Sequence, residues 1–149
     1  MIVPVPPRLD LCQSSRLCCI GLGGEEELQT SKQDTGDWGE ALVADHLTAH
    51  GYAVLARNYE CTWGEVDLIA EKGELLVFVE VKTRATDVFG DPEEVVTPRK
   101  RWRVVRAALH FLTRHQIHDR VVRFDVASVV GRPGGAMIQL FEDAFDAGM

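Results

Sequence analysis

Long apolar runs are absent from this sequence, since no stretch approaches the ~20 residues that a helix needs to cross a bilayer. The N-terminal stretch MIVPVPPRLDLCQSSRLCCIGLGG is not a clean secretory signal, because prolines and charged residues interrupt it. The four cysteines show neither the paired C-x-x-C spacing of a zinc site nor the density of a disulfide scaffold. We therefore expect a soluble, cytoplasmic protein with reduced cysteines and no membrane partner.

An excess of positive charge is also lacking, because the formal net charge is -7. This average argues against a protein that coats nucleic acid through its total charge. However, eight of the 16 Lys and Arg residues lie between Arg99 and Arg123, where Asp119 is the only acid. Because the local field steers a polyanion more than the total charge does, this segment is a candidate nucleic-acid interface.

The length of 149 residues suits one domain with a hydrophobic core and is short for two. Residues 1–35 contain early prolines and then a polar, glycine-rich stretch without periodicity, so we expect a disordered leader. Residues 36–149 are expected to form the single domain.

The domain begins with a predicted helix that has Asp37 as its N-cap, Glu40 as the capping-box partner and Gly51 as its stop. The further expected elements are strands at 52–59, 64–70 and 74–84, a helix from Pro98 to about His115, and strands at 120–130 and 136–142. The order helix, three strands, helix, strands predicts an α/β sandwich with a mixed central sheet.

Charged residues interrupt the two apolar strands at 64–70 and 74–84. Glu80 and Lys82 share one face of the second strand because side chains alternate, and hairpin pairing would bring Asp67 close to Glu80. Two adjacent carboxylates repel each other unless a proton or a cation lies between them. Mg²⁺ is the natural occupant, because it is typically bound by one or two carboxylates and phosphate oxygens. Lys82 could then orient a water or stabilise charge during attack on a phosphodiester.

Plainer interpretations of these charges stay open. Glu80 and Lys82 could form a surface ion pair worth less than ~1 kcal/mol, and Glu65 could simply be solvated at its strand's start. Asp67 is harder to explain in this way, because apolar residues follow it and a buried unpaired carboxylate is costly. Glu40 lies on the apolar stripe of its helix, which allows an inward-facing role, a capping role or both.

The blocks GDWGE, GYAVLARNYE, GEVDLIA, VFVEVKTR, TPRK and RFDV, in this order and spacing, resemble the YraN-like family of uncharacterised bacterial proteins. That family in turn resembles archaeal Holliday-junction resolvases and the restriction-endonuclease-like superfamily. The resemblance covers about Gly36 to Phe145 and implies a restriction-endonuclease-like three-layer sandwich with a mixed central sheet. Arg101 stands where the family usually has glutamine, which puts a glutamine-dependent role in doubt but not the metal site.

The resemblance also implies a function: a Mg²⁺-dependent endonuclease, with Mn²⁺ as an alternative ion, that acts on branched or structured DNA as a homodimer. It implies that Asp67 and Glu80 ligate the metal and that Lys82 acts on the water. Glu40 is the implied additional acid on the first helix.

The second predicted helix carries a basic stripe. A helical wheel places Arg99, Arg103, Arg106, His110 and Arg114 on one side. Such a stripe can hold phosphates without reading sequence, and it is also what a solvated helix face looks like. The predicted nucleic-acid-binding residues are Arg99, Lys100, Arg103, Arg106 and Arg114. The tryptophans at positions 38, 63 and 102 are expected to pack rather than to stack on bases.

Three classes of function remain open at this point. The first is a Mg²⁺-dependent endonuclease, the second is a nucleic-acid-binding module with the fold but no turnover, and the third is a structural protein with a buried charge network. The set of Asp67, Glu80 and Lys82 favours the first, because binding alone would not require all three chemical types.

Overall fold

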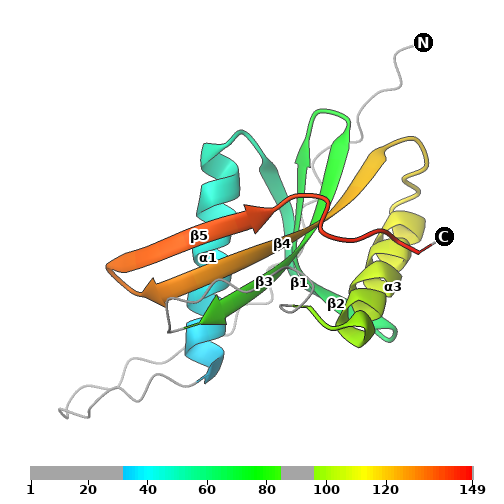
Figure 1. Cartoon of the computed structure of the whole chain (residues 1–149). Helices are drawn as coiled ribbons and strands as arrows, with labels where there is room; N and C mark the ends of the chain where they lie inside the picture. Colours follow the sequence, from blue (N-terminus) through cyan, green and yellow to red (C-terminus); the bar gives the residue numbers. More distant parts are fainter. Residues whose placement is uncertain (1–31, 85–95, 149) are drawn as a thin grey trace, which may run out of the picture.

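The computed structural model describes residues 32–84 and 96–148 (Figure 1). Its elements are α1 (Lys32–Ala49), β1 (Ala53–Cys61), β2 (Gly64–Lys72), β3 (Leu75–Arg84), α3 (Pro98–Arg114), β4 (Val121–Arg132) and β5 (Gly135–Phe141). Their order is the one that the sequence pattern predicts. Over these residues, neither helix combines the length and apolarity that spanning a membrane requires.

The strands form one sheet in the order β1-β2-β3-β4-β5. Short turns make β1–β2, β2–β3 and β4–β5 antiparallel, whereas β3 and β4 run parallel. A parallel pair requires a crossover connection, and α3 lies in that connection. The sheet is therefore mixed, as predicted.

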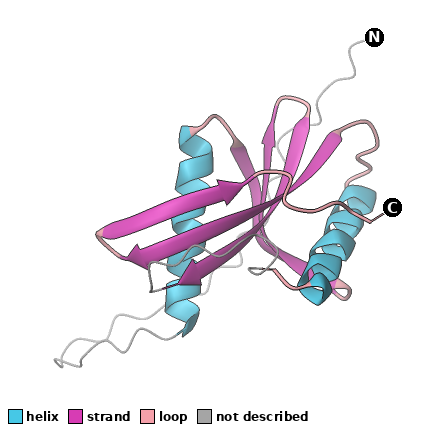
Figure 2. Ribbon diagram, viewed as in Figure 1, coloured by secondary structure: helices cyan, strands magenta, loops and turns pink. Residues whose placement is uncertain are grey.

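The two helices lie on opposite faces of the sheet (Figure 2). One hydrophobic cluster lies under α3 and includes Phe78 and Phe111, and the other lies under α1 and includes Leu47 and Val77. Alternate residues of β3 contribute to the two clusters, as a strand that is covered on both faces must. The result is the three-layer α/β sandwich of restriction-endonuclease-like proteins.

The start of α1 differs from the prediction. The helix begins at Lys32, five residues before Asp37. Asp37 is therefore a solvent-exposed residue within the helix and not the N-cap. The capping-box prediction for Glu40 is therefore wrong. Residues 32–36 contain no proline, and extending an existing helix costs far less than starting one. Most of the predicted leader (residues 1–31) and of the predicted loop (residues 85–95) lies outside the described residues.

The start of α3 agrees with its sequence signals. Pro98 occupies the first turn, and the side-chain oxygen of Thr97 accepts a hydrogen bond from the backbone amide of Lys100 at 3.4 Å. The buried side of the helix includes Val104, Ala108 and Phe111, whereas Leu109 is exposed.

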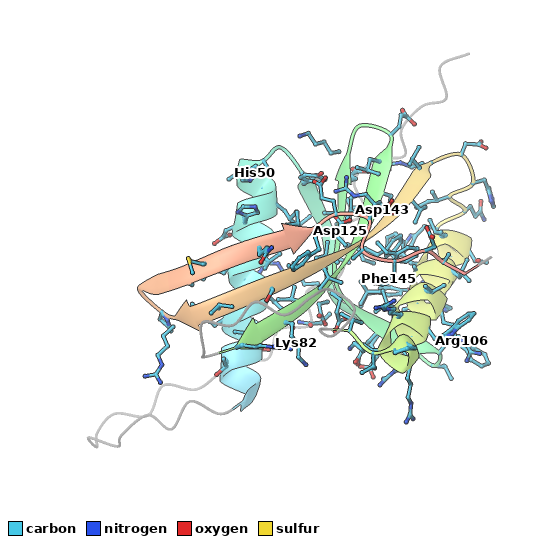
Figure 3. The ribbon with its side chains drawn as sticks, in the orientation of Figure 1. His50, Lys82, Arg106, Asp125, Asp143 and Phe145 are labelled. Carbon is cyan, nitrogen blue, oxygen red and sulfur yellow. The ribbon has the colours of Figure 1, made fainter. Side chains whose placement is uncertain are left out.

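A buried ion pair ties β4 to the C-terminal segment. Asp125 is fully buried, and Arg123 donates to its two carboxylate oxygens from Nε at 2.8 Å and from Nη2 at 2.7 Å. The same carboxylate accepts the backbone amide of Asp143 at 2.9 Å, and Asp125 and Asp143 are labelled side by side in Figure 3. Arg123 also donates to the hydroxyl of Tyr52 at 3.2 Å. The RFDV block therefore has a structural role, and Arg123 is not available to a basic surface.

We expect Asp125→Ala to lower the free energy of unfolding by about 3 kcal/mol or more, because it removes the buried counter-charge of Arg123 and leaves only the exposed carboxylate of Glu142. Urea denaturation measures this loss. The double variant Arg123→Met/Asp125→Leu should recover much of the stability, since it removes both charges. A loss of less than about 1 kcal/mol in Asp125→Ala would show that the pair behaves as a solvent-exposed one.

Candidate functional site

The carboxylates of Asp67 and Glu80 are adjacent, at the point where the backbone pairing of β2 with β3 ends. Backbone pairing of these strands extends from Lys72 and Leu75 to Leu68 and Val79, and one further step of this register would place Asp67 opposite Glu80. The carboxylate of Asp67 accepts the backbone amide of Val81 at 2.7 Å. The Asp67 side chain therefore accepts a hydrogen bond from Val81, which lies on β3 beyond the last paired residues. This bond holds the Asp67 carboxylate next to Glu80.

Glu80 is an acid that is difficult to ionise. It is only 6% exposed, and burial together with the neighbouring carboxylate of Asp67 raises its pKa to about 8. Burial also raises the pKa of Asp67, although the bond from the Val81 amide opposes this effect. Oε2 of Glu80 is buried with no hydrogen-bond donor among the described residues. A hydrogen bond between two carboxylates needs a proton, so this pair requires either a proton or a cation.

Lys100, from the first turn of α3, partly neutralises these carboxylates. Its Nζ lies 2.6 Å from Oε1 of Glu65 and 3.2 Å from Oε1 of Glu80, and its side chain is 26% exposed. Burial opposes the charged form of Lys100, but the hydrogen bond to Glu65 and the attraction of Glu80 and Asp67 raise its pKa overall. The bond from Lys100 also lowers the pKa of Glu65. Lys100, predicted only as a phosphate-binding residue, therefore lies within the carboxylate cluster.

A glycine in β2 allows α3 to come this close. A Cβ atom at Gly64 would lie 1.9 Å from the backbone oxygen of Arg103, so any other residue would force the helix away. The contact brings Arg103 to Glu65, with 3.6 Å between Nη2 and Oε2. The GE pair of the GEVDLIA block thus combines a packing glycine with an acid that binds α3.

A second glycine brings α1 to the same place from the opposite face. A Cβ atom at Gly39 would lie 1.9 Å from Oγ1 of Thr83, and Glu40 is the next residue. Burial and the charge of Asp67 raise the pKa of Glu40, while a hydrogen bond from the side chain of Asn58 opposes this. Glu40 therefore lies close enough to Asp67 for the two carboxylates to interact electrostatically, which supports the inward-facing role of Glu40.

Asn58, the partner of Glu40, occupies an unusual backbone position. Its φ of 49° is left-handed, a conformation that asparagine tolerates better than most residues. Pairing of β1 with β2 passes from Arg57–Leu68 to Tyr59–Val66 at this point. No sequence signal marked Asn58 as part of the site, because its contact with Glu40 depends on the packing of α1 against the sheet.

Lys82 lies two residues beyond Glu80, near the end of β3, and is labelled in Figure 3. Its side chain is exposed, and it has no hydrogen-bond or ion-pair partner among residues 32–84 and 96–148. Its role toward water or phosphate stays a prediction.

The donor set fits Mg²⁺ better than it fits zinc. In the part of the chain that the structure describes, no three or more His, Cys, Asp or Glu side chains are arranged to hold a metal ion, as a zinc site requires. Asp67 and Glu80 provide two adjacent carboxylates and a buried oxygen without a donor. Mg²⁺ needs only one or two protein carboxylates, because waters and phosphate oxygens complete its shell.

Comparison with known proteins identifies the family. The model of a family described as "Uncharacterised protein family UPF0102" matches residues 39–129, which include all the carboxylates of this site and Lys100. The chain belongs to the UPF0102 family, which is restriction-endonuclease-like.

Several curated UPF0102 proteins are similar to the chain over most of their length. The one from Myxococcus xanthus is 44% identical over 118 residues, which are 79% of this chain and 94% of the relative. The one from Syntrophus aciditrophicus is 40% identical over 117 residues, 78% of this chain and 92% of the relative. The one from Anaeromyxobacter dehalogenans is 41% identical over 126 residues, 85% and 92% of the two chains.

The basic segment of this UPF0102 chain divides into structural and exposed residues. Three arginines are engaged in the fold, because Arg101 donates to the carbonyl of Val96 at 3.0 Å, Arg120 binds Glu71 and Arg123 binds Asp125. The exposed members of the predicted set are Arg99, Arg103, Arg106 and Arg114. Figure 3 shows Arg106 on the side of α3 that faces away from the sheet.

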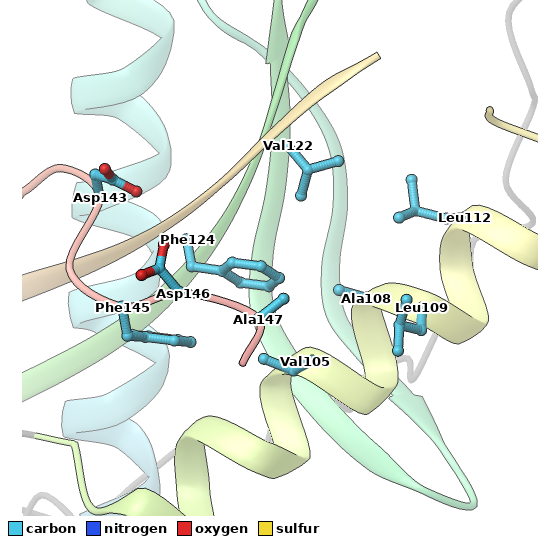
Figure 4. Close-up of a pocket in the computed structure, with 10 residues that line it drawn as sticks. All are labelled: Val105, Ala108, Leu109, Leu112, Val122, Phe124, Asp143, Phe145, Asp146 and Ala147. Carbon is cyan, nitrogen blue, oxygen red and sulfur yellow. The ribbon is translucent and has the colours of Figure 1, made fainter. Parts of the chain in front are cut away.

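The UPF0102 chain also has an apolar pocket of about 300 Å³ between α3, β4 and the C-terminal segment (Figure 4). Its lining includes Val105, Phe124 and Phe145, with Asp143 and Asp146 as the acidic members. None of the carboxylates of the candidate site lines it. The pocket is therefore separate from the site built around Asp67 and Glu80.

Proposed function

We propose that this protein is a metal-dependent endonuclease that binds and cleaves branched or structured DNA. The observation that carries the proposal is the adjacent pair Asp67 and Glu80, which leaves a buried carboxylate oxygen without a donor. Perturbed acids of this kind cluster at functional sites. The restriction-endonuclease-like fold supports the same chemistry. The resemblance of the sequence blocks to Holliday-junction resolvases favours a branched substrate.

In this proposal Asp67 and Glu80 hold Mg²⁺, or Mn²⁺ in its place. The ion supplies stabilisation of a phosphoryl oxygen and a water of lowered pKa. The Val81 amide keeps Asp67 in position. Glu40 adds negative potential from α1, which increases the affinity of the carboxylate pair for a cation.

Two lysines are candidates for the contact with the reacting phosphate. Lys82 is exposed beside Glu80, whereas Lys100 binds Glu65 and Glu80 when no other cation is present. We infer that Lys100 neutralises the cluster in the free protein, and that it would be free to contact a phosphate oxygen if a metal ion took its place at Glu80.

The ion pairs of Lys100 also favour a competing function. A lysine that joins Glu65 and Glu80 is what a purely structural charge network would contain. The stability of the metal-free Glu80→Gln variant separates the two functions, because only a structural network loses stability when Glu80 loses its charge.

The direct test is cleavage of a small substrate panel in Mg²⁺, Mn²⁺ or EDTA. The panel contains a four-way junction, a flap, a single strand and a plain duplex of the same length. We expect cleavage of a branched substrate that requires a divalent ion, with the plain duplex left intact. Binding of DNA without cleavage in either ion would overturn the endonuclease proposal and would indicate a DNA-binding module.

DNA binding is expected to depend on the exposed arginines of α3. The triple variant Arg103→Ala/Arg106→Ala/Arg114→Ala should weaken binding of every DNA in the panel. It should also reduce the slope of log affinity against log salt by about 3, because each phosphate contact releases counterions. Titrations at several salt concentrations measure both effects. Arg132→Ala is the control, because Arg132 is exposed on β4, in a different element. An unchanged slope in the triple variant would mean that the stripe is only solvated.

A further inference from the structure

Trp63 is an exposed aromatic residue beside the candidate site. It lies with Thr62 in the turn between β1 and β2, and it is 60% exposed. The expectation that the tryptophans pack is met by Trp38, which contacts the cluster under α1. It is not met by Trp63 or by Trp102, which is 56% exposed. A single exposed apolar residue needs no functional explanation by itself. What distinguishes Trp63 is its position in the fold.

That position is next to the basic helix. Gly64, the neighbour of Trp63, packs so closely on α3 that an added Cβ atom would lie 1.9 Å from the backbone oxygen of Arg103. The side chains of Arg103 and Arg106 are exposed on the same part of the helix. The turn that carries Trp63 therefore lies beside the part of α3 that carries these two exposed arginines.

The same strand connects this surface to the carboxylates. Glu65, two residues after Trp63, binds both Lys100 and Arg103, and Asp67 is two residues further on. With about 3.3 Å per strand residue, Trp63 and Asp67 are separated by about 13 Å along β2. That separation is within the reach of a few nucleotides. A DNA strand that has a phosphate at Asp67 and Glu80 can thus place a nearby base at Trp63.

We propose that Trp63 is a stacking site for an unpaired base, so that the substrate is DNA with single-stranded nucleotides next to the cleaved phosphate. This proposal rests on the endonuclease function proposed above and narrows its substrate class to forks and flaps. An indole face accepts any base, and basic side chains hold the backbone between stacked bases. A base inside an intact duplex is already stacked on both faces and offers no free face to the indole. The exposed arginines on the adjacent part of α3 favour a polyanion over a protein partner.

Trp102 provides a matched control. It is as exposed as Trp63 and lies on α3 itself, but its ring is adjacent to Gly148, where an added Cβ atom would be 3.9 Å from Cη2. Its ring therefore lies beside the C-terminal segment.

The first experiment measures affinity, in EDTA to prevent cleavage, for a fork with single-stranded arms and for a duplex of equal length. We expect Trp63→Ala to weaken fork binding about 10-fold or more, because stacking contributes ~1–3 kcal/mol per base. Duplex binding should stay within about twofold, since the phosphate contacts are unchanged. Trp63→Phe should keep most of the fork affinity, and Trp102→Ala should keep all of it.

The second experiment uses Trp38→Phe/Trp102→Phe, in which Trp63 is the remaining tryptophan. The fork should quench its fluorescence, and the duplex should quench it less. If the parent binds both DNAs and Trp63→Ala weakens neither, the stacking site is wrong and the endonuclease proposal stands. If the parent binds no DNA, both proposals fail. If Trp63→Ala instead dissociates a homo-oligomer in sedimentation, Trp63 is a protein contact and the stacking site is overturned.

Discussion

Asp67→Asn and Glu80→Gln are each expected to abolish Mg²⁺ binding and DNA cleavage together. The site offers two adjacent carboxylates, so each substitution removes one of the two negatively charged ligands available to the ion. We expect the cleavage rate to fall by roughly 10³-fold or more, since the charge stabilisation that the ion supplies is lost. Calorimetric titration with Mg²⁺ and initial rates on the preferred branched substrate measure the two effects.

The two lysines should behave differently from the carboxylates. Lys82→Met should keep Mg²⁺ binding and lower only the rate, because Lys82 does not contact the carboxylates. Lys100→Met should bind Mg²⁺ more tightly, because it removes the cation that pairs with Glu80. Its rate then shows whether Lys100 also acts on the phosphate.

The control for these variants is Glu74→Gln, because Glu74 is exposed in the turn at the opposite end of the same hairpin. It should change neither Mg²⁺ binding nor the cleavage rate. Full cleavage by Asp67→Asn would contradict the assignment of the site.

Glu80→Gln is also expected to make the metal-free protein more stable at alkaline pH. The pKa of Glu80 is about 8 in the folded protein against 4.5 without the fold's influence. Between these values the folded state binds more protons than the unfolded state, so stability falls as the pH rises toward 8. The slope is about 1.4 kcal/mol per pH unit, which amounts to a few kcal/mol over this window. Glutamine imitates the protonated acid and should remove this loss.

Urea denaturation in EDTA at pH 5 and pH 8.5 measures this effect. The gain from Glu80→Gln should be large at pH 8.5 and small at pH 5, where the parent is already protonated. Mg²⁺ should raise the melting temperature of the parent and leave that of the variant unchanged. The structural network requires the opposite result, because Lys100 would lose a partner and the variant would be less stable at both pH values. That result, with no response of the parent to Mg²⁺, would end the endonuclease proposal.

Much of the fold could be predicted because its signals are local. Alternation along β2 and β3, the short turn between them and Pro98 at the start of α3 each act within a few residues. The hairpin also brings Asp67 to Glu80, because antiparallel pairing over a short turn determines which residues face each other. The start of α1 was predicted five residues too late, because Asp37 and Glu40 form a capping-box pattern inside a helix that has already begun.

The sequence by itself therefore determined the order of the elements, the mixed sheet and the central carboxylate pair. Only the tertiary structure decided which residues surround that pair. Lys100 reaches Glu65 across 35 positions, and Glu40 faces Asp67 from the other side of the sheet. These contacts depend on how closely each helix packs, which the glycines at positions 39 and 64 permit without any periodic pattern. Packing also decided which arginines are available to a ligand. Arg123 is held by buried Asp125, whereas the arginines of α3 are exposed, so burial and not charge content determines which cations a ligand can contact.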